Sequence, residues 1–256
     1  MRFRIIPVLL LKNGGLYKGV KFKDHKYVGD PLNAVKIFNE KEVDELVFLD
    51  INATTNNRAP NLAFLKDIAS ECFMPLAYGG GINSVDMIRE ILKAGIEKVI
   101  VNSAAVKNPQ LVAEASQYFG RSTIVASIDV KKNFLGKPQV YINSGLEKTN
   151  LNYLEWAKNL EGLGVGEIII NSIDQDGTLN GYDLELVRQV TSVVSVPVIA
   201  AGGGRNMKDF VSVCSTYGAS AAAAGASFVF HGKHKAVLIT YPSEREIPNA
   251  LGQTYL

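Results

Sequence analysis

The stretch PLAYGGGINSVDMIREILKAGIEKVIVNSAA, residues 75–105, decides the fold, because the similar stretch PVIAAGGGRNMKDFVSVCSTYGASAAAAGAS occupies residues 197–227. Each copy has a short apolar strand, a glycine-rich turn, an amphipathic helix, a second apolar strand and a turn of small residues. The two copies lie about half a chain apart, a period far longer than that of a solenoid. The repeat therefore indicates two related half-domains.

The repeat extends beyond these two stretches. VDELVFLDINAT (43–54) matches VGEIIINSIDQDGT (165–178), and RIIPVLLLKN (4–13) matches TIVASIDVKK (123–132). In the last pairing Leu10 falls opposite Asp129. One half therefore keeps a carboxylate where the other has an apolar side chain.

Apolar runs and amphipathic segments alternate along the whole chain. The runs predict strands at 4–11, 45–50, 75–78, 98–102, 123–129, 167–171, 197–200 and 220–224. The amphipathic segments predict helices at 31–41, 61–72, 84–94, 109–118, 151–163, 184–194 and 207–217. The strands are continuously apolar, as expected when both faces of a parallel sheet are buried. The pattern predicts one α/β domain over 1–256, a (βα)8 TIM barrel built from half-barrels at about 1–120 and 121–230.

Three segments depart from this alternation. Residues 12–30 form a long polar connection with Lys18, Lys21, Lys23, His25 and Lys26, which we interpret as a lid or binding loop; a solvated basic loop is the alternative. Residues 130–148 predict a short hairpin on the same face of the barrel. Residues 231–256 are atypical, because they show no clear eighth amphipathic helix and KAVLITYP (235–242) resembles a strand.

Composition narrows the class of protein. With 256 residues, 47% of them hydrophobic, the chain is long enough for a large core, and its net charge of +2 predicts no nucleic-acid partner. The apolar run at 5–11 is interpreted as a buried strand rather than a signal peptide. No run approaches the ~18 apolar residues of a membrane span. Cys72 and Cys214 have no metal or redox spacing and indicate reduced packing residues of a cytosolic protein.

Small-residue turns follow several predicted strands, where a barrel carries its functional groups. These turns lie at 79–81, 102–104, 202–204 and 224–227. Glycine lets the backbone approach an anion, and the amides at a helix start favour negative charge. We therefore predict two phosphate sites on opposite sides of one mouth, which suits a substrate with a phosphate at each end. Tight strand–helix packing is the alternative explanation of these glycines.

Carboxylates also follow predicted strands. Asp129 ends the fifth strand and is the preferred candidate for a general acid or base, while Asp50 at the end of the second could be catalytic or structural. Asp174 and Asp176 follow the sixth strand, and Asp176 before a glycine could instead form an Asx turn. His231 and His234 are interpreted as surface residues, so no metal site is predicted.

Four charged residues mark the opposite rim. Arg4, Glu45, Lys98 and Glu167 stand at the starts of predicted strands, and a barrel would bring them together. Two acids and two bases can satisfy one another as salt bridges. From the residues alone, structural closure of the barrel bottom is the simplest interpretation.

Together these motifs resemble the cyclase subunit of imidazole glycerol phosphate synthase. The resemblance runs from Arg4 to about His231 and is carried by VDELVFLDI, YGGGI, VNSAAV, SIDQDGT followed by GYD, and AGGG. It implies a doubled (βα)8 barrel, a bisphosphorylated substrate and no cofactor. It also implies a glutaminase subunit at the barrel bottom and passage of ammonia through the barrel to a lyase and cyclisation reaction at the mouth.

The resemblance assigns roles residue by residue. It implies one phosphate site at Gly81, Asn102 and Ser103, and another at Asp176, Gly177, Gly203 and the turn that contains Gly225 and Ala226. It makes Arg4, Glu45, Lys98 and Glu167 the ammonia gate, Lys18 a residue of the mobile first loop and Asp129 one of two catalytic aspartates. The other aspartate falls on Leu10, which cannot transfer a proton, and loss of a general acid removes roughly 10²–10⁴-fold of rate.

KYVGDP, FNEKEVDEL, ECFMP and FVFHGKHKAVL resemble a divergent branch of the family that is associated with surface-polysaccharide biosynthesis. That branch implies ammonia supply to a separate ATP-dependent amidotransferase, which converts an acetamido group on a sugar to an acetamidino group. Two alternatives stay open. One is a genuine cyclase of histidine biosynthesis with a substituted acid, and the other is a noncatalytic scaffold that joins a glutaminase to another enzyme.

Overall fold

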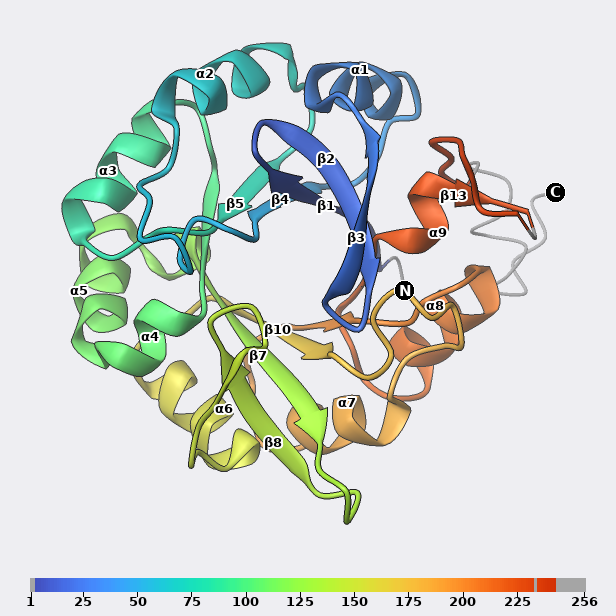
Figure 1. The fold of residues 1–256 in the computed structure, drawn as a ribbon. Coiled ribbons are helices and arrows are strands. Elements are labelled where there is room, and N and C mark those ends of the chain that lie inside the picture. The colour runs from blue at the N-terminus through green and yellow to red at the C-terminus, as the bar shows by residue number, and fades with distance from the viewer. Residues whose placement is uncertain (1–2, 233, 243–256) are drawn as a thin grey trace, which may run out of the picture.

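Eight parallel strands close into a barrel in the computed structural model, which describes residues 3–232 and 234–242 (Figure 1). The barrel strands are β1 (Arg4–Lys12), β4 (Leu46–Asp50), β5 (Leu76–Gly79), β6 (Lys98–Val101), β7 (Ile124–Lys132), β10 (Glu167–Ser172), β11 (Val198–Ala201) and β12 (Ala221–Ala224). Each pairs with the next, and β12 returns to β1 with Arg4 beside Ala221. The predicted (βα)8 barrel is confirmed.

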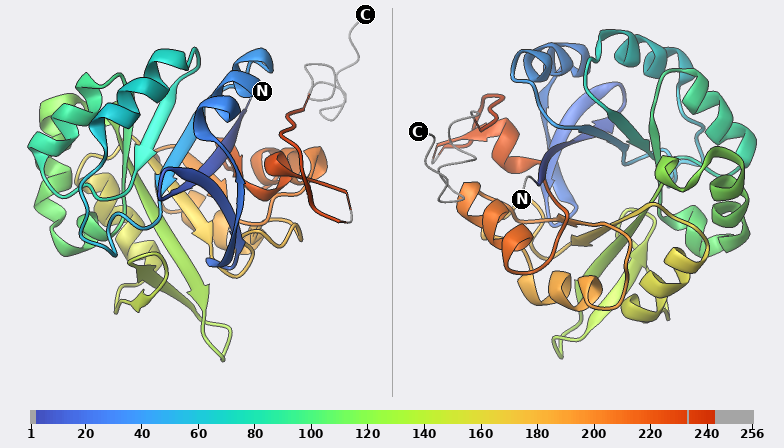
Figure 2. Two further views of the ribbon diagram at one scale, coloured as in Figure 1. Left: turned by 45° about the horizontal axis from the view of Figure 1, so that its top comes forward. Right: turned by 180° about the vertical axis from the view of Figure 1, so that it is seen from behind.

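Helices surround the barrel in a single outer ring (Figure 2). They are α1 (Pro31–Glu40), α2 (Leu62–Glu71), α3 (Val85–Lys93), α4 (Ser103–Lys107), α5 (Pro109–Phe119), α6 (Tyr153–Gly162), α7 (Leu184–Thr191), α8 (Met207–Ser215) and α9 (Ala226–Val229), with one 3-10 turn at Arg121–Thr123. Six helices begin after an Asp, Asn or Ser whose side chain accepts a backbone N–H, which satisfies a donor that the helix itself leaves free. These caps are Asp30, Asn61, Ser84, Asn152, Asp183 and Asn206.

The core has two layers because each barrel strand is buried on both faces. Outward side chains pack against the helices, and the inward ones form a separate apolar cluster. The buried members of the inner cluster are Ile6, Val47, Ala77, Ile100, Val125, Ile169, Ile199, Ala221 and Ala223. The inner cluster lies between the two ends of the barrel. The same strands position the side chains at both ends.

Two hairpins stand on the face where the strands end. Strands β2 (Gly15–Val20) and β3 (Lys23–Gly29) extend the sheet antiparallel from β1. The long polar connection expected over 12–30 is therefore a β-hairpin, whose backbone groups pair in a ladder. Strand β8 (Pro138–Ile142) pairs antiparallel with β7 and is followed by β9 (Glu147–Lys148), which confirms the hairpin expected at 130–148.

The end of the chain differs from the other seven units. Strand β12 is followed by the four-residue α9 and then by a small hairpin of β13 (Phe230–His231) and β14 (Ala236–Val237). This segment lies between α8 and α1 (Figure 1). The strand expected over 235–242 is thus limited to two residues, and most of the atypical segment 231–256 lies outside the described residues.

Candidate functional site

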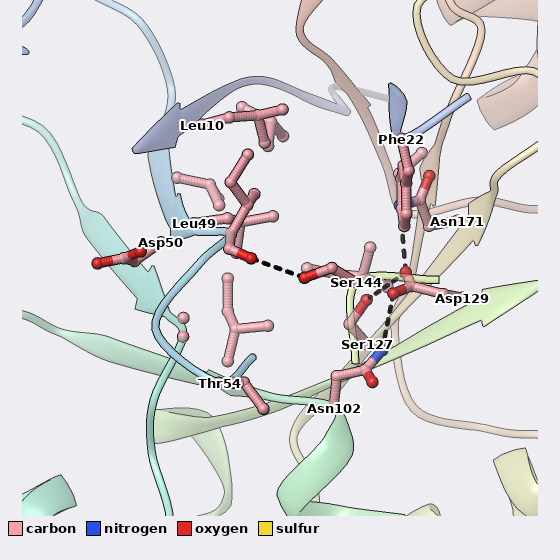
Figure 3. A pocket seen from close by; sticks show the side chains of 18 of the residues that line it. Leu10, Phe22, Leu49, Asp50, Thr54, Asn102, Ser127, Asp129, Ser144 and Asn171 are labelled. Carbon is pink, nitrogen blue, oxygen red and sulfur yellow. Dashed lines mark hydrogen bonds between the residues drawn. The ribbon is translucent and has the colours of Figure 1, made fainter. Parts of the chain in front are cut away.

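A cavity of about 290 Å³ opens where the barrel strands end. The barrel brings to it predicted residues from distant parts of the sequence. They are Leu10, Lys18, Gly81, Asn102, Ser103, Asp129, Asp176 and Gly225. The cavity is the candidate ligand site of the mouth (Figure 3).

Asp129 near the end of β7 is the buried carboxylate of this cavity, with 9% of its surface exposed. Its oxygens accept hydrogen bonds from Asn102 Nδ2 at 3.0 Å, Asn171 Nδ2 at 3.2 Å and Ser127 Oγ at 3.4 Å. Burial raises the pKa of Asp129 to about 7, helped by the nearby Asp176 and opposed by these three donors. A carboxyl group with a pKa near neutrality can both give and take a proton.

Leu10 lies on the opposite side of the cavity from Asp129 (Figure 3). Its neighbours in the lining include Val8 on the same strand and Leu49 on β4. This wall is apolar, whereas the wall of β6, β7 and β10 carries the amide and carboxyl groups around Asp129. Apolar side chains therefore adjoin position 10, where the resemblance implies a second aspartate, in contrast to the hydrogen-bond donors around Asp129.

The β2–β3 hairpin closes over one side of the mouth. Lys18 on β2 is 5% exposed, and its Nζ lies 2.7 Å from Asp176 Oδ1. The backbone N–H of Lys21 donates to the carbonyl of Asp176 at 2.8 Å, and Phe22 at the hairpin turn lines the cavity. The alternative of a solvated loop is wrong for Lys18, although the neighbouring Lys23 and Lys26 are exposed.

The two predicted phosphate sites differ in size. The first, with Gly81, Asn102 and Ser103, faces the large cavity beside Thr54. The second is a separate hollow of about 10 Å³, room for about one water molecule. It is lined by Asp176, Gly177, Gly203, Gly225 and Ala226 among others. The hairpin adjoins this second site, since a Cβ added to Gly177 would lie 2.2 Å from the carbonyl oxygen of Gly19.

Two other candidate acids are held by local contacts. Asp50 lines the cavity, but its carboxylate binds Arg58 at 2.7 Å and accepts backbone N–H groups from residues 52 and 53. Asp174 accepts the backbone N–H of Lys132 at 2.7 Å. These contacts favour a structural role for both carboxylates in shaping loops at the mouth.

The opposite end of the barrel carries the four predicted charged residues, which we call the charged ring: Arg4, Glu45, Lys98 and Glu167. Arg4 contacts Glu45 at 2.6 Å and Glu167 at 2.7 Å. Lys98 contacts the same two carboxylates at 3.0 and 3.1 Å. Acids and bases thus alternate, and every member has two partners of opposite charge, so the ring closes the floor of the barrel.

Several residues of the site were not predicted. Asn171 and Ser127 hold Asp129, Ser144 lines the cavity and donates to the carbonyl of Ile51 at 2.7 Å, and Phe22 covers the mouth. A signal existed for two of them, because Asn171 and Ser127 are inward-facing polar residues in otherwise apolar strands. Ser144 and Phe22 belong to hairpin turns whose position depends on the folded chain.

In the described part of the chain, no group of three or more His, Cys, Asp or Glu side chains is arranged to hold a metal ion, and His231 and His234 are exposed. Within the same residues, no helix has the length and apolar character that a membrane crossing requires.

Comparison with known proteins agrees with this geometry. The family described as "Histidine biosynthesis protein" matches residues 4–235. A Pseudomonas aeruginosa protein provisionally named imidazole glycerol phosphate synthase subunit hisF2 is 49% identical over 96% of this chain and 98% of its own length. The imidazole glycerol phosphate synthase subunit HisF of Alkaliphilus metalliredigens is 41% identical over 89% of this chain and 90% of its own length. The chain therefore belongs to the histidine biosynthesis protein family, among the HisF cyclase subunits of imidazole glycerol phosphate synthase.

Proposed function

We propose that this protein is an ammonia-conducting barrel subunit that receives ammonia from a glutaminase and delivers it for amidation of a surface-polysaccharide sugar. The observation that carries the proposal is the contrast between the two ends of the barrel. The charged ring is complete, whereas the mouth has Leu10 opposite Asp129. A barrel that keeps its charged ring and has no carboxylate at position 10 suits transport better than cyclisation.

The barrel interior supports passage of the neutral molecule. Between the charged ring and the mouth, the inner cluster is apolar, with alanines on β5 and β12. An apolar lining strongly disfavours a bare ammonium ion, whereas neutral ammonia loses much less solvation there. Ammonia that travels inside the barrel therefore avoids protonation by bulk water before it reaches the acceptor.

The acceptor in this proposal is bound by a separate enzyme. An ATP-dependent amidotransferase would use the ammonia to convert an acetamido group on the sugar to an acetamidino group. Leu10 supports this, because Asp129 without a second carboxylate at position 10 cannot serve as both acid and base in one turnover as efficiently as two carboxylates. The first phosphate site remains open to the cavity and can hold a phosphorylated ligand.

An isotope competition tests the proposal in a reconstituted complex of the chain, its cognate glutaminase and the amidotransferase. The complex receives glutamine labelled with nitrogen-15 in the amide, together with unlabelled ammonium in the buffer. We expect labelled product from the wild type. Lys98→Ala leaves Glu45 and Glu167 without one of their two cations, so the ring no longer separates the barrel interior from the solvent. Unlabelled ammonia from the buffer then mixes with the labelled ammonia, and the ratio of labelled to unlabelled product falls.

Lys93→Ala on the exposed face of α3 is the matched control for loss of a lysine, and it should keep the wild-type ratio. A noncatalytic scaffold with a closed barrel predicts a different result. In that case neither Lys98→Ala nor Glu45→Ala changes the ratio, and the nitrogen in the wild-type product has the isotope composition of the bulk ammonium pool.

The second candidate function is a genuine imidazole glycerol phosphate synthase cyclase in histidine biosynthesis, which the retained Asp129 and the two phosphate sites favour. Purified protein with ammonium salt and the bisphosphate substrate of that pathway decides between the two. Turnover at ordinary enzyme rates would contradict the transport proposal. Absence of turnover in the wild type, with activity gained in Leu10→Asp, would attribute the loss to position 10.

A further inference from the structure

The space beside β12 is filled by aromatic side chains rather than by a long helix. Tyr182, Phe210, Phe228 and Tyr241 form a row with successive ring-centre distances of 6.4, 5.8 and 5.7 Å. Phe210 comes from α8 and Phe228 from α9. The row therefore joins the last described part of the chain to the barrel wall.

Tyr241 ends this row at the floor of the barrel. Its hydroxyl lies 3.0 Å from the carbonyl oxygen of Ile5 and 3.2 Å from Asp44 Oδ2. The same carboxylate oxygen accepts the backbone N–H of Ile5 at 2.9 Å. One hydroxyl and one carboxylate thus tie the start of β1 to the residues just before β4.

These contacts adjoin two members of the charged ring. Ile5 follows Arg4 directly, and Asp44 precedes Glu45 directly. Arg4 and Glu45 form the shortest ion pair of the ring, at 2.6 Å. Such charge-assisted contacts depend steeply on the geometry of donor and acceptor, so the spacing of the two backbones decides whether the pair forms.

We propose that Tyr241 is a positioning residue of the charged ring, through which the C-terminal segment holds Arg4 and Glu45 at ion-pair distance. The inference rests on the proposed transport function and adds an element to it. Tyr241 acts through the backbone of Ile5 and the carboxylate of Asp44.

Tyr182 provides a matched control at the other end of the aromatic row. Its hydroxyl donates to the carbonyl of Ala223 at 3.0 Å, and the bond is buried. Ala223 is two residues along β12 from Ala221, the neighbour of Arg4. Tyr182→Phe therefore loses the same kind of hydrogen bond in the same row, away from the ring.

The test compares Tyr241→Phe with Tyr182→Phe in the isotope competition described above. Both variants are expected to lower the melting temperature by about 2–4 °C, the shift for loss of one hydrogen bond in a domain of this size. In Tyr241→Phe the ratio of labelled to unlabelled product falls about fivefold, the change in an open–closed equilibrium that one hydrogen bond produces. In Tyr182→Phe the ratio stays at the wild-type value. The rate of glutamate release by the glutaminase is followed in parallel, to show that the complex is intact.

Asp44→Asn is a second variant, used if Tyr241→Phe does not fold, and it should also lower the ratio. If both Tyr241→Phe and Asp44→Asn keep the wild-type ratio while Lys98→Ala lowers it, the positioning role is wrong and the transport function stands. If Tyr182→Phe lowers the ratio as much as Tyr241→Phe, the effect reflects stability and the inference is also wrong. A wild-type complex whose product has only the isotope composition of the bulk ammonium overturns both proposals.

Discussion

At the scale of single residues, two side chains that face each other across the mouth differ in polarity. Asp129 is buried and accepts hydrogen bonds from two asparagine amides, whereas Leu10 across the cavity offers only apolar surface. Three donors can stabilise a carboxylate, yet burial outweighs them and leaves its pKa near 7. The protonation of Asp129 therefore changes within the physiological range, and this has a measurable effect on stability.

Asp129→Asn should remove a pH dependence of folding. Burial raises the pKa of Asp129 from its ordinary 3.8 to about 7. At a pH between these two pKa values, the Asp129 carboxyl is ionised in the unfolded chain and protonated in the folded chain. The free energy of unfolding therefore falls as the pH rises. The slope reaches about 1.4 kcal/mol per pH unit and disappears above a pH of about 7. Urea unfolding at pH values of about 5 and about 7 measures it.

The control for this prediction is Asp86→Asn on α3, where the side chain is 85% exposed. That variant should keep the wild-type difference between the two pH values. An Asp129→Asn protein with an undiminished difference would show that the aspartate ionises normally in the folded state.

At the scale of elements, the β2–β3 hairpin decides how accessible the mouth is. It continues the sheet from β1, and it is fastened on its far side by Lys18 to Asp176 and by the N–H of Lys21 to the same residue's carbonyl. Gly177 allows this close approach because its φ of +70° and its lack of a side chain leave room for Gly19. The hairpin therefore adjoins the hollow that was predicted as the second phosphate site.

Gly177→Ala should loosen the hairpin while the barrel stays folded. The added methyl would meet the carbonyl of Gly19 at 2.2 Å, and the positive φ costs a further ~1 kcal/mol or more. The closed hairpin is then less populated, and trypsin should cleave after Lys18 and Lys21 roughly tenfold faster than in the wild type. Timed proteolysis with mass spectrometry identifies the cut sites.

Gly136→Ala is the matched control, since Gly136 also has a positive φ of +75° but no atom within 4 Å of an added Cβ. It carries the same conformational strain without a collision against the hairpin. Equal cleavage rates in the two variants would mean that strain, and not contact with Gly19, determines the accessibility of the hairpin.

At the scale of the whole molecule, the two ends of the barrel differ, because one holds the cavity and the other holds the charged ring. Phe73 is 86% exposed in the connection between α2 and β5, at the end that carries the charged ring. Asn39 holds this connection, because its side chain donates to the carbonyl of Glu71 and accepts the N–H of Phe73. An exposed aromatic residue on a fixed turn can anchor a docking partner.

Phe73→Ser should therefore weaken binding of the glutaminase proposed for this face. Loss of an aromatic anchor typically costs about 1–2 kcal/mol, so we expect Kd to rise roughly tenfold in a calorimetric titration. Phe134→Ser is the control, because Phe134 is 95% exposed on the β7–β8 turn at the mouth. If Phe134→Ser weakens the complex and Phe73→Ser leaves it unchanged, the glutaminase binds at the mouth. That result would contradict our proposal, which places it at the end with the charged ring.

The sequence predicted the barrel and most of the residues at its two ends for a physical reason. Continuous apolar runs identify strands buried on both faces, and the residues that end or begin them must gather at one rim. Asp129 and the charged ring follow directly from that rule. The β2–β3 hairpin does not, because KDHKYVG is largely polar and its ladder depends on attachment to β1. Contacts such as Lys18 with Asp176, or Tyr241 with Ile5, join residues far apart in sequence and leave no local pattern.

The charged ring also limits which substitutions the protein can accept during evolution. It holds two positive and two negative side chains in mutual contact. Replacing a single member leaves a half-buried charge with too few partners, which is costly, whereas replacing an acid and a base together restores neutrality. Substitutions at positions 4, 45, 98 and 167 are therefore expected to be accepted in compensating pairs, so these four positions should vary together or not at all among related barrels.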